Sequence, residues 1–127
     1  MTKILVVDDE PDVELLFRQK FRKEIKSGEL SFVFAFNGSE ALNFLRALQP
    51  LDLVMVLSDI NMPGMTGLEL LEIIRNDFPN LRVMMVTAYG DDNNYNKAMQ
   101  LGAFDFLTKP VDFSKIREII NELKSGP

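Results

Sequence analysis

The chain has 127 residues, a net charge of −5 and 46% hydrophobic residues, which suits one compact globular domain. It has no cysteine and no histidine, which excludes disulfides, the usual zinc sites and catalysis by a thiolate or an imidazole. The acidic balance offers nucleic acid no basic surface, and no apolar run approaches the roughly 18 residues of a membrane span. The start, MTKILVVDDE, does not resemble a signal peptide, so we expect a cytoplasmic protein.

Short apolar runs predict five β-strands along the chain. They cover residues 4–7, 32–36, 53–57, 83–86 and 104–107. Three of these runs are nearly continuous in apolar character, which is typical of parallel strands covered on both faces. The fifth run alternates, with Asp105 between Phe104 and Phe106, and this favours a place at the edge of the sheet.

Amphipathic segments between the strands predict helices. The first segment has an apolar face made of Val13, Leu16, Phe17, Phe21 and Ile25. Ser39 is the expected N-cap of the second helix, and Thr66 with Glu69 forms a capping box ahead of the third. Asp91 and Asp112 are the expected N-caps of the last two helices. The apolar face of the last helix consists of Ile116, Ile119, Ile120 and Leu123.

Strands and helices alternate five times, which predicts a single α/β domain with an open, doubly wound parallel sheet. Right-handed crossovers leave 2-1-3-4-5 as the expected strand order, the flavodoxin-like arrangement. We place the domain at residues 3–124 and a short tail at 125–127. Ligands of such sheets bind at the carboxyl ends of the strands, at the switch point between the first and third strands.

Polar residues follow the expected carboxyl ends of the strands. Asp8 and Asp9 follow the first strand, Asp59 the third, Thr87 the fourth and Lys109 the fifth. Clustered carboxylates repel one another, so their ionised state needs compensation. Lys109 supplies one positive charge, and a bound Mg²⁺, which prefers oxygen ligands, would supply the rest.

This set of residues fits phosphoryl transfer onto a carboxylate. A carboxylate can act as the nucleophile and form an aspartyl-phosphate. Such a transfer needs positioning and neutralised phosphoryl oxygens rather than a general base. Mg²⁺, the Lys109 ammonium and the Thr87 hydroxyl would provide that neutralisation, so the chemistry requires no histidine.

Four stretches, VVDDEP, LSDINMPGMTGLEL, VTAYG and GAFDFLTKP, resemble the receiver domain of bacterial two-component response regulators. The resemblance runs from Lys3 to about Leu123, with every signature in order and at the family's spacing. Each short motif alone would be unspecific, whereas the ordered set is highly specific.

The resemblance implies that Asp59 is the phospho-acceptor. It also implies a Mg²⁺ site in which Asp9 and Asp59 are direct ligands, Asn61 contributes its backbone carbonyl and Asp8 acts through water. Asn61 and Tyr89 would tune dephosphorylation, because these positions flank the path of the attacking water in similar receivers.

A conformational switch is also implied. Lys109 would pair with the phosphoryl group, and the bond to Pro110 is cis in many relatives. Thr87 and the aromatic ring of Phe106 would form the switch. Relatives often have tyrosine at the Phe106 position, so a hydroxyl found there is missing in this chain.

The implied phosphoryl donor is a sensor histidine kinase or a phosphotransfer protein, since this chain has no histidine of its own. Such a domain is a phospho-accepting signalling module rather than an enzyme. Phosphorylation is expected to alter the face formed by the last two helices and the last strand, residues 91–124. That face would contact an output domain, a partner protein or a second copy of the chain.

The residues also allow three alternative functions. A phosphatase of the haloacid dehalogenase type would have a second aspartate two residues after its nucleophile, whereas Asp8 and Asp9 are adjacent. A flavodoxin-like flavin carrier would need a Ser/Thr/Gly-rich phosphate loop where this chain has Asp-Asp-Glu. A receiver-like interaction module that is never phosphorylated usually lacks an acid of the pair, the acceptor or the lysine, and all are present here.

Overall fold

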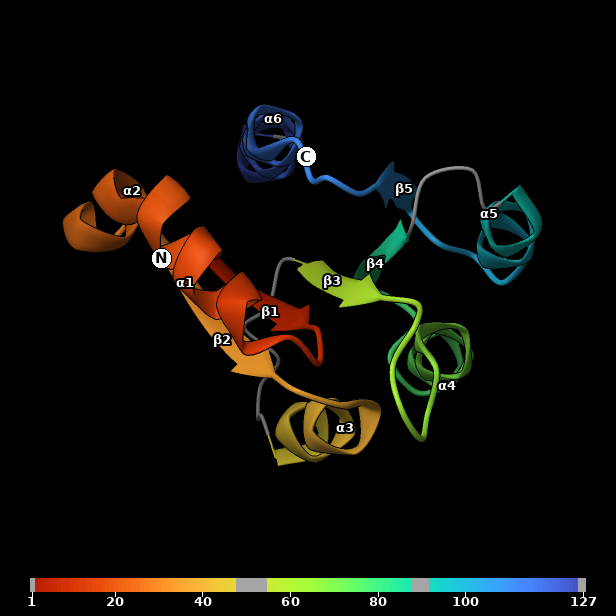
Figure 1. Ribbon diagram of the computed structural model, residues 1–127. Coiled ribbons are helices and arrows are strands. Elements are labelled where there is room, and N and C mark those ends of the chain that lie inside the picture. The colour runs from red at the N-terminus through yellow and green to blue at the C-terminus, as the bar shows by residue number, and fades with distance from the viewer. Residues whose placement is uncertain (1, 48–54, 88–91, 126–127) are drawn as a thin grey trace.

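The computed structural model describes residues 2–47, 55–87 and 92–125. Its centre is a five-stranded parallel sheet in the order β2-β1-β3-β4-β5, which confirms the predicted fold class and strand order (Figure 1). The strands are β1 (Thr2–Val7), β2 (Leu30–Ala35), β3 (Met55–Asp59), β4 (Arg82–Thr87) and β5 (Asp105–Thr108). The first two residues of the run predicted at 53–57 lie outside the described residues, and β3 continues to Asp59.

Helices cover both faces of the sheet. The described helices are α1 (Pro11–Lys20), α2 (Arg22–Ser27), α3 (Gly38–Ala47), α4 (Gly67–Asp77), α5 (Asp92–Gln100) and α6 (Phe113–Ser125). α1, α2 and α6 lie on one face, and α3, α4 and α5 lie on the other (Figure 1). Within the three described ranges, no helix is long and apolar enough to cross a membrane.

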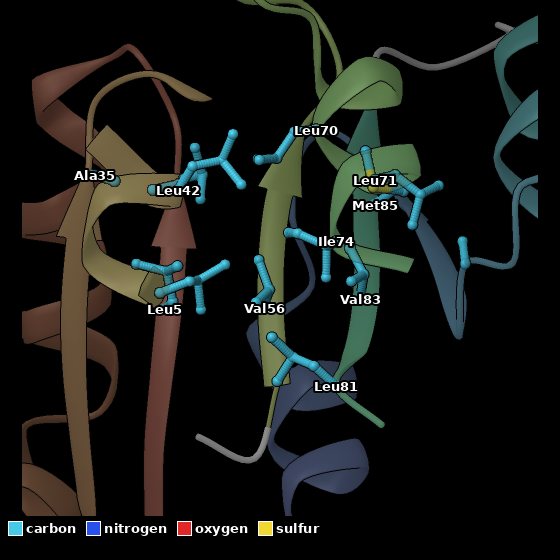
Figure 2. Close-up of a cluster of buried hydrophobic side chains, with 14 of the residues drawn as sticks. Leu5, Ala35, Leu42, Val56, Leu70, Leu71, Ile74, Leu81, Val83 and Met85 are labelled. Carbon is cyan, nitrogen blue, oxygen red and sulfur yellow. The ribbon is translucent and has the colours of Figure 1, made fainter. Parts of the chain in front are cut away.

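Two apolar clusters attach these helices to the sheet. The cluster beneath α3 and α4 includes Leu5, Leu42, Val56, Leu70, Ile74 and Val83 (Figure 2). The cluster on the opposite face includes Ile4, Phe17, Leu57, Val86 and Ile116. All five residues of β3 are buried, as expected for a central parallel strand. Each fully buried Leu, Ile or Val contributes roughly 1.5–3 kcal/mol, so these clusters fix the positions of the strand ends.

The segment predicted to be one helix after β1 is divided in two. α1 ends at Lys20, and Phe21 has φ −110° and ψ 24° before α2 begins. The Phe21 ring is fully buried and packs against Phe17 and Phe32, with ring centroids 6.0 and 5.2 Å away. We attribute the break to this packing, which outweighs the tendency of the segment to continue as one helix.

The predicted apolar face of α1 is only partly correct. Phe17 is buried, whereas Leu16 is 44% exposed. The reason is that only a narrow stripe of α1, centred on Phe17, lies against the sheet.

Two of the predicted helix caps are confirmed. The Thr66 side chain accepts from the Glu69 backbone N–H at 3.2 Å, and the Glu69 carboxylate accepts from the Thr66 N–H at 3.0 Å. Asp112 Oδ1 accepts from the Ser114 N–H at 2.9 Å at the start of α6. The predicted cap Asp91 lies outside the described residues.

The predicted cap Ser39 is wrong. α3 begins at Gly38, so Ser39 lies inside the helix. Asn37 takes the capping role, because its Oδ1 accepts from the Glu40 backbone N–H at 2.8 Å. Asn37 and Ser39 are both favoured cap residues, and the backbone position decides between them.

Candidate functional site

The turn after β1 positions two aspartates. Asp8 is 8% exposed, its N–H donates to the Ala35 carbonyl at 3.0 Å, and its Oδ1 accepts from the Glu10 N–H at 3.0 Å. Asp9 is exposed. Pro11 then begins α1, at a position where its missing N–H is not needed. The turn therefore holds one carboxylate inside the rim of the sheet and its neighbour in solvent.

Asp59 is the last residue of β3 and is only 5% exposed. Its Oδ2 accepts a hydrogen bond from Lys109 Nζ at 3.1 Å. Its Oδ1 accepts from the Asn61 N–H at 3.4 Å, a long hydrogen bond. A nearly buried carboxylate is tolerated only when it is paired, and the pairing with Lys109 meets that requirement.

Gly67 brings the start of α4 against the end of β3. Its N–H donates to the Ile60 carbonyl at 2.8 Å, and the Ile60 N–H donates to the Val86 carbonyl at 3.0 Å. A Cβ at position 67 would overlap the Asp59 carbonyl oxygen and lie 2.6 Å from the Ile60 Cα. The loop after Asp59 therefore needs glycine at this position, because backbone atoms occupy the space of a side chain.

Lys109 reaches the carboxylates from the end of β5. Its N–H donates to the Thr87 carbonyl at 2.7 Å, and its bond to Pro110 is cis. Its Nζ lies 3.1 Å from Asp59 Oδ2, 3.6 Å from Asp8 Oδ2 and 3.6 Å from Glu10 Oε1. One ammonium group is thus shared by three carboxylates.

These contacts shift two pKa values. Burial by itself would lower the pKa of Lys109, but the hydrogen bond to Asp59 and the surrounding negative charges outweigh burial and raise it. For Asp8, burial raises the pKa, and the negative charge of Asp59 adds to this against the opposing backbone hydrogen bond from Glu10. Lys109 is therefore firmly charged at neutral pH, whereas the ionised form of Asp8 is disfavoured.

The carboxylates form a cluster that suits a cation. Oxygens of Asp8, Asp9, Glu10 and Asp59 all lie within 4.8 Å of one another. An all-oxygen set of this kind fits a hard divalent cation such as Mg²⁺. The pKa of Asp8 is raised mainly by burial and further by the charge of Asp59, so a bound cation would favour its ionised form. Asn61, the remaining predicted ligand, is exposed two residues after Asp59.

The predicted switch residues lie on two neighbouring strands. Thr87 is fully buried, and its hydroxyl has no hydrogen-bond partner within the described part of the chain. Such an unpaired buried hydroxyl is uncommon and can serve a ligand oxygen. Phe106 is half-buried on β5, with its ring edge-on to Tyr95 of α5 at 5.0 Å. Tyr89 lies outside the described residues.

A family model described as the response regulator receiver domain matches residues 4–121. The chain belongs to this family. As a receiver domain, it is a phosphorylation-based signalling module of a two-component system, as the sequence predicted. This membership rules out the haloacid dehalogenase and flavodoxin alternatives.

Relatives of this receiver domain differ in length. It is 42% identical over 120 residues to the response regulator protein PilR of Pseudomonas aeruginosa, covering 93% of this chain and 25% of PilR. It is 36% identical over 120 residues to the sporulation initiation phosphotransferase F of Bacillus subtilis, covering 94% of this chain and 91% of that protein. The chain therefore spans a quarter of one curated relative and nearly all of another.

A solved structure of similar fold is the response regulator protein TrrA of Thermotoga maritima in complex with Mg(2+)-BeF. It is 30% identical to this receiver domain, with a TM-score of 0.78, and the match covers 97% of this chain and 99% of that one.

The receiver site contains two residues that the sequence did not identify as part of it. The sequence pattern indicated no role for Glu10, yet its carboxylate lies 3.6 Å from Lys109 Nζ. Gly67 is held against the Asp59 backbone. Two sequence features could have identified these residues. Glu10 directly follows two clustered aspartates, and Gly67 is a glycine at the first position of a predicted helix.

Proposed function

We propose that Asp59 accepts a phosphoryl group from a phosphohistidine of a sensor kinase or phosphotransfer protein, in a reaction that requires Mg²⁺. The single observation that carries the proposal is the nearly buried Asp59 carboxylate paired with Lys109 at 3.1 Å and surrounded by further carboxylates. This arrangement supports a phospho-acceptor that assists its own reaction rather than an enzyme acting on other substrates. A cytoplasmic location is part of this proposal.

The bonds that change are few. An Asp59 carboxylate oxygen attacks the phosphorus of the donor and forms the new P–O bond. The P–N bond to the donor imidazole breaks, its electron pair stays on that nitrogen, and the nitrogen takes a proton from solvent. Lys109 neutralises a phosphoryl oxygen, and the Thr87 hydroxyl donates to another, which satisfies its unpaired hydrogen-bonding capacity.

Mg²⁺ would be held by Asp9 and Asp59, by the Asn61 carbonyl, and by Asp8 through water. When bound, it supplies the positive charge that neutralises the phosphoryl oxygens and the crowded carboxylates. Asn61 also belongs, with Tyr89, to the pair proposed to tune dephosphorylation.

The proposed output surface is the face of α5, β5 and α6. Three large apolar side chains of α5 and the segment before β5 are exposed there: Tyr95, Met99 and Phe104. Phe106 lies next to Tyr95 and connects this surface with β5. Exposed apolar groups of this kind support a contact with an output domain, a partner protein or a second copy of the chain.

Intact-mass spectrometry with a small phosphodonor such as acetyl phosphate tests the acceptor assignment. Wild-type protein in Mg²⁺ should gain one phosphate, and a chelator should abolish the gain. Asp59→Asn should gain none, whereas Asp77→Asn, a control at an exposed carboxylate at the end of α4, should behave as wild type. Equal labelling of Asp59→Asn and wild type would falsify the assignment. An unlabelled wild-type protein would favour the interaction module that is never phosphorylated.

A further inference from the structure

Glu10 joins the carboxylate site through both its backbone and its side chain. It is the N-cap residue of α1, in an extended conformation with φ −91° and ψ 118°, but its side chain makes no capping hydrogen bond. The backbone N–H instead donates to Asp8 Oδ1 at 3.0 Å. The carboxylate is 3.6 Å from Lys109 Nζ and is 63% exposed. An acid that merely complements the helix dipole would need neither contact.

The charge balance of the site depends on this residue. Oxygens of Asp8, Asp9, Glu10 and Asp59 lie within 4.8 Å of one another, and Lys109 is the ammonium group that ion-pairs with three of these residues. Lys109 neutralises only one of the negative charges. Glu10 adds a fourth negative charge to those of Asp8, Asp9 and Asp59. The added charge is unfavourable without a cation and favourable with one.

We propose that Glu10 is a positioning residue that strengthens Mg²⁺ binding as a fourth carboxylate of the site and shares Lys109 with Asp59 until a phosphoryl group arrives. Thr87 adjoins the site, since its carbonyl accepts from the Lys109 N–H at 2.7 Å, and its buried hydroxyl has no hydrogen-bond partner among the described residues, an independent sign that the site takes a ligand. The inference rests on the proposed function for the role of the phosphoryl group. Its cation-binding part can be measured on the unphosphorylated protein.

Isothermal titration calorimetry with Mg²⁺ on the full chain measures this contribution. Glu10→Gln keeps the shape of the side chain and removes its charge. Because a unit charge acts on a divalent cation across a few ångströms of partly screened water, we expect the dissociation constant to rise roughly three- to tenfold at about 0.15 M salt. The difference from wild type should shrink as salt is added.

Two further variants separate the role of Glu10 from a general charge effect. Asp12→Asn removes an equal charge from the first turn of α1, outside the cluster, and should change the Mg²⁺ dissociation constant less than twofold. Glu10→Asp keeps the charge and should retain most of the affinity. A Glu10→Gln protein that binds Mg²⁺ as tightly as wild type, or no more weakly than Asp12→Asn, would overturn the inference.

Failure of this inference is distinguishable from failure of the proposed function. Labelling of Asp59 by acetyl phosphate tests the proposed function alone. If Asp59 is labelled and Glu10→Gln binds Mg²⁺ normally, only the role of Glu10 is wrong. If Glu10→Gln weakens Mg²⁺ binding but Asp59 is never labelled, the fourth carboxylate is supported and the phosphorylation proposal fails.

Discussion

At the scale of single residues, the ionised carboxylate of Asp8 lowers the unfolding free energy of the protein. Burial raises its pKa, and the nearby charge of Asp59 adds to the shift. The folded protein therefore binds protons more readily at Asp8 than the unfolded chain, whose ordinary pKa is 3.8. Between that value and the raised pKa, stability falls as pH rises, and the full penalty is present above the raised pKa.

We therefore predict that Asp8→Asn stabilises the protein in chelator at neutral pH, because it removes the unfavourable charge. The gain should disappear as pH falls below about 3.8, where Asp8 is protonated in both states. Urea denaturation at several pH values measures this difference in unfolding free energy. Thermal denaturation would show the same change, since at this chain length ~1 kcal/mol corresponds to roughly 3–5 °C in melting temperature. Asp9 is exposed, so its charge is better solvated, and Asp9→Asn serves as the control with a smaller gain in stability. A less stable Asp8→Asn protein at neutral pH would contradict the account.

Gly67→Ala should both destabilise the protein and impair phosphorylation. The new methyl group would meet backbone atoms of Asp59 and Ile60, which cannot move without displacing the acceptor. We expect a loss of about 1–3 kcal/mol in unfolding free energy and slower labelling by acetyl phosphate.

Gly38→Ala is the matched control for Gly67→Ala. Both glycines are the first residue of a helix, but a Cβ at position 38 would meet the flexible Met65 side chain, with Sδ 2.6 Å away. Gly38→Ala should therefore leave labelling nearly unchanged. Equal labelling rates for the two variants would show that Gly67 does not position Asp59.

At the scale of helices, Arg117 of α6 contacts both α1 and α2 where the first helical segment is interrupted. Its Nε donates to Glu24 Oε2 at 2.8 Å, and its Nη2 donates to the Lys20 carbonyl at 2.7 Å. Its guanidinium also lies 4.8 Å from the centre of the Phe21 ring. One side chain thus joins the last helix to the first two.

Arg117→Ala should lower the unfolding free energy by about 1–2 kcal/mol, a value that allows for partial screening by solvent. Arg46→Ala removes an exposed ion pair between α3 and α4, with the Arg46 and Asp77 side chains 57% and 49% exposed, and should lower it by less than about 0.5 kcal/mol. Urea denaturation of both variants measures the difference. Two equal losses would mean that Arg117 contributes no more than an ordinary surface pair.

Elements that follow from local patterns could be predicted from the sequence. Apolar runs specified the strands, and the residues after each run identified Asp8, Asp59 and Lys109 as neighbours at one edge. Features that depend on distant side chains could not be predicted. The break at Phe21 depends on Phe32 and other aromatic rings, and the role of Glu10 depends on a lysine 99 positions further along the chain, from 10 to 109.

At the scale of the whole molecule, the strands connect the carboxylate site with the proposed output face. Thr87 pairs with Thr108 in the sheet, and Phe106 of β5 packs against Tyr95 of α5. A Thr87 hydroxyl drawn to a phosphoryl oxygen would leave space that Phe106 can fill by changing rotamer. The phosphoryl group shifts this equilibrium only by its differential affinity for the two arrangements.

The central claim is that a phosphoryl group on Asp59 alters the face of α5, β5 and α6. Hydrogen exchange measured by mass spectrometry, with and without the phosphoryl mimic beryllofluoride and Mg²⁺, tests this claim most directly. We predict changed protection in α5, β5 and α6, within residues 92–124, and no such change in Asp59→Asn. Protection changes confined to α1, α2 and α3, or changes that persist in Asp59→Asn, would contradict the account.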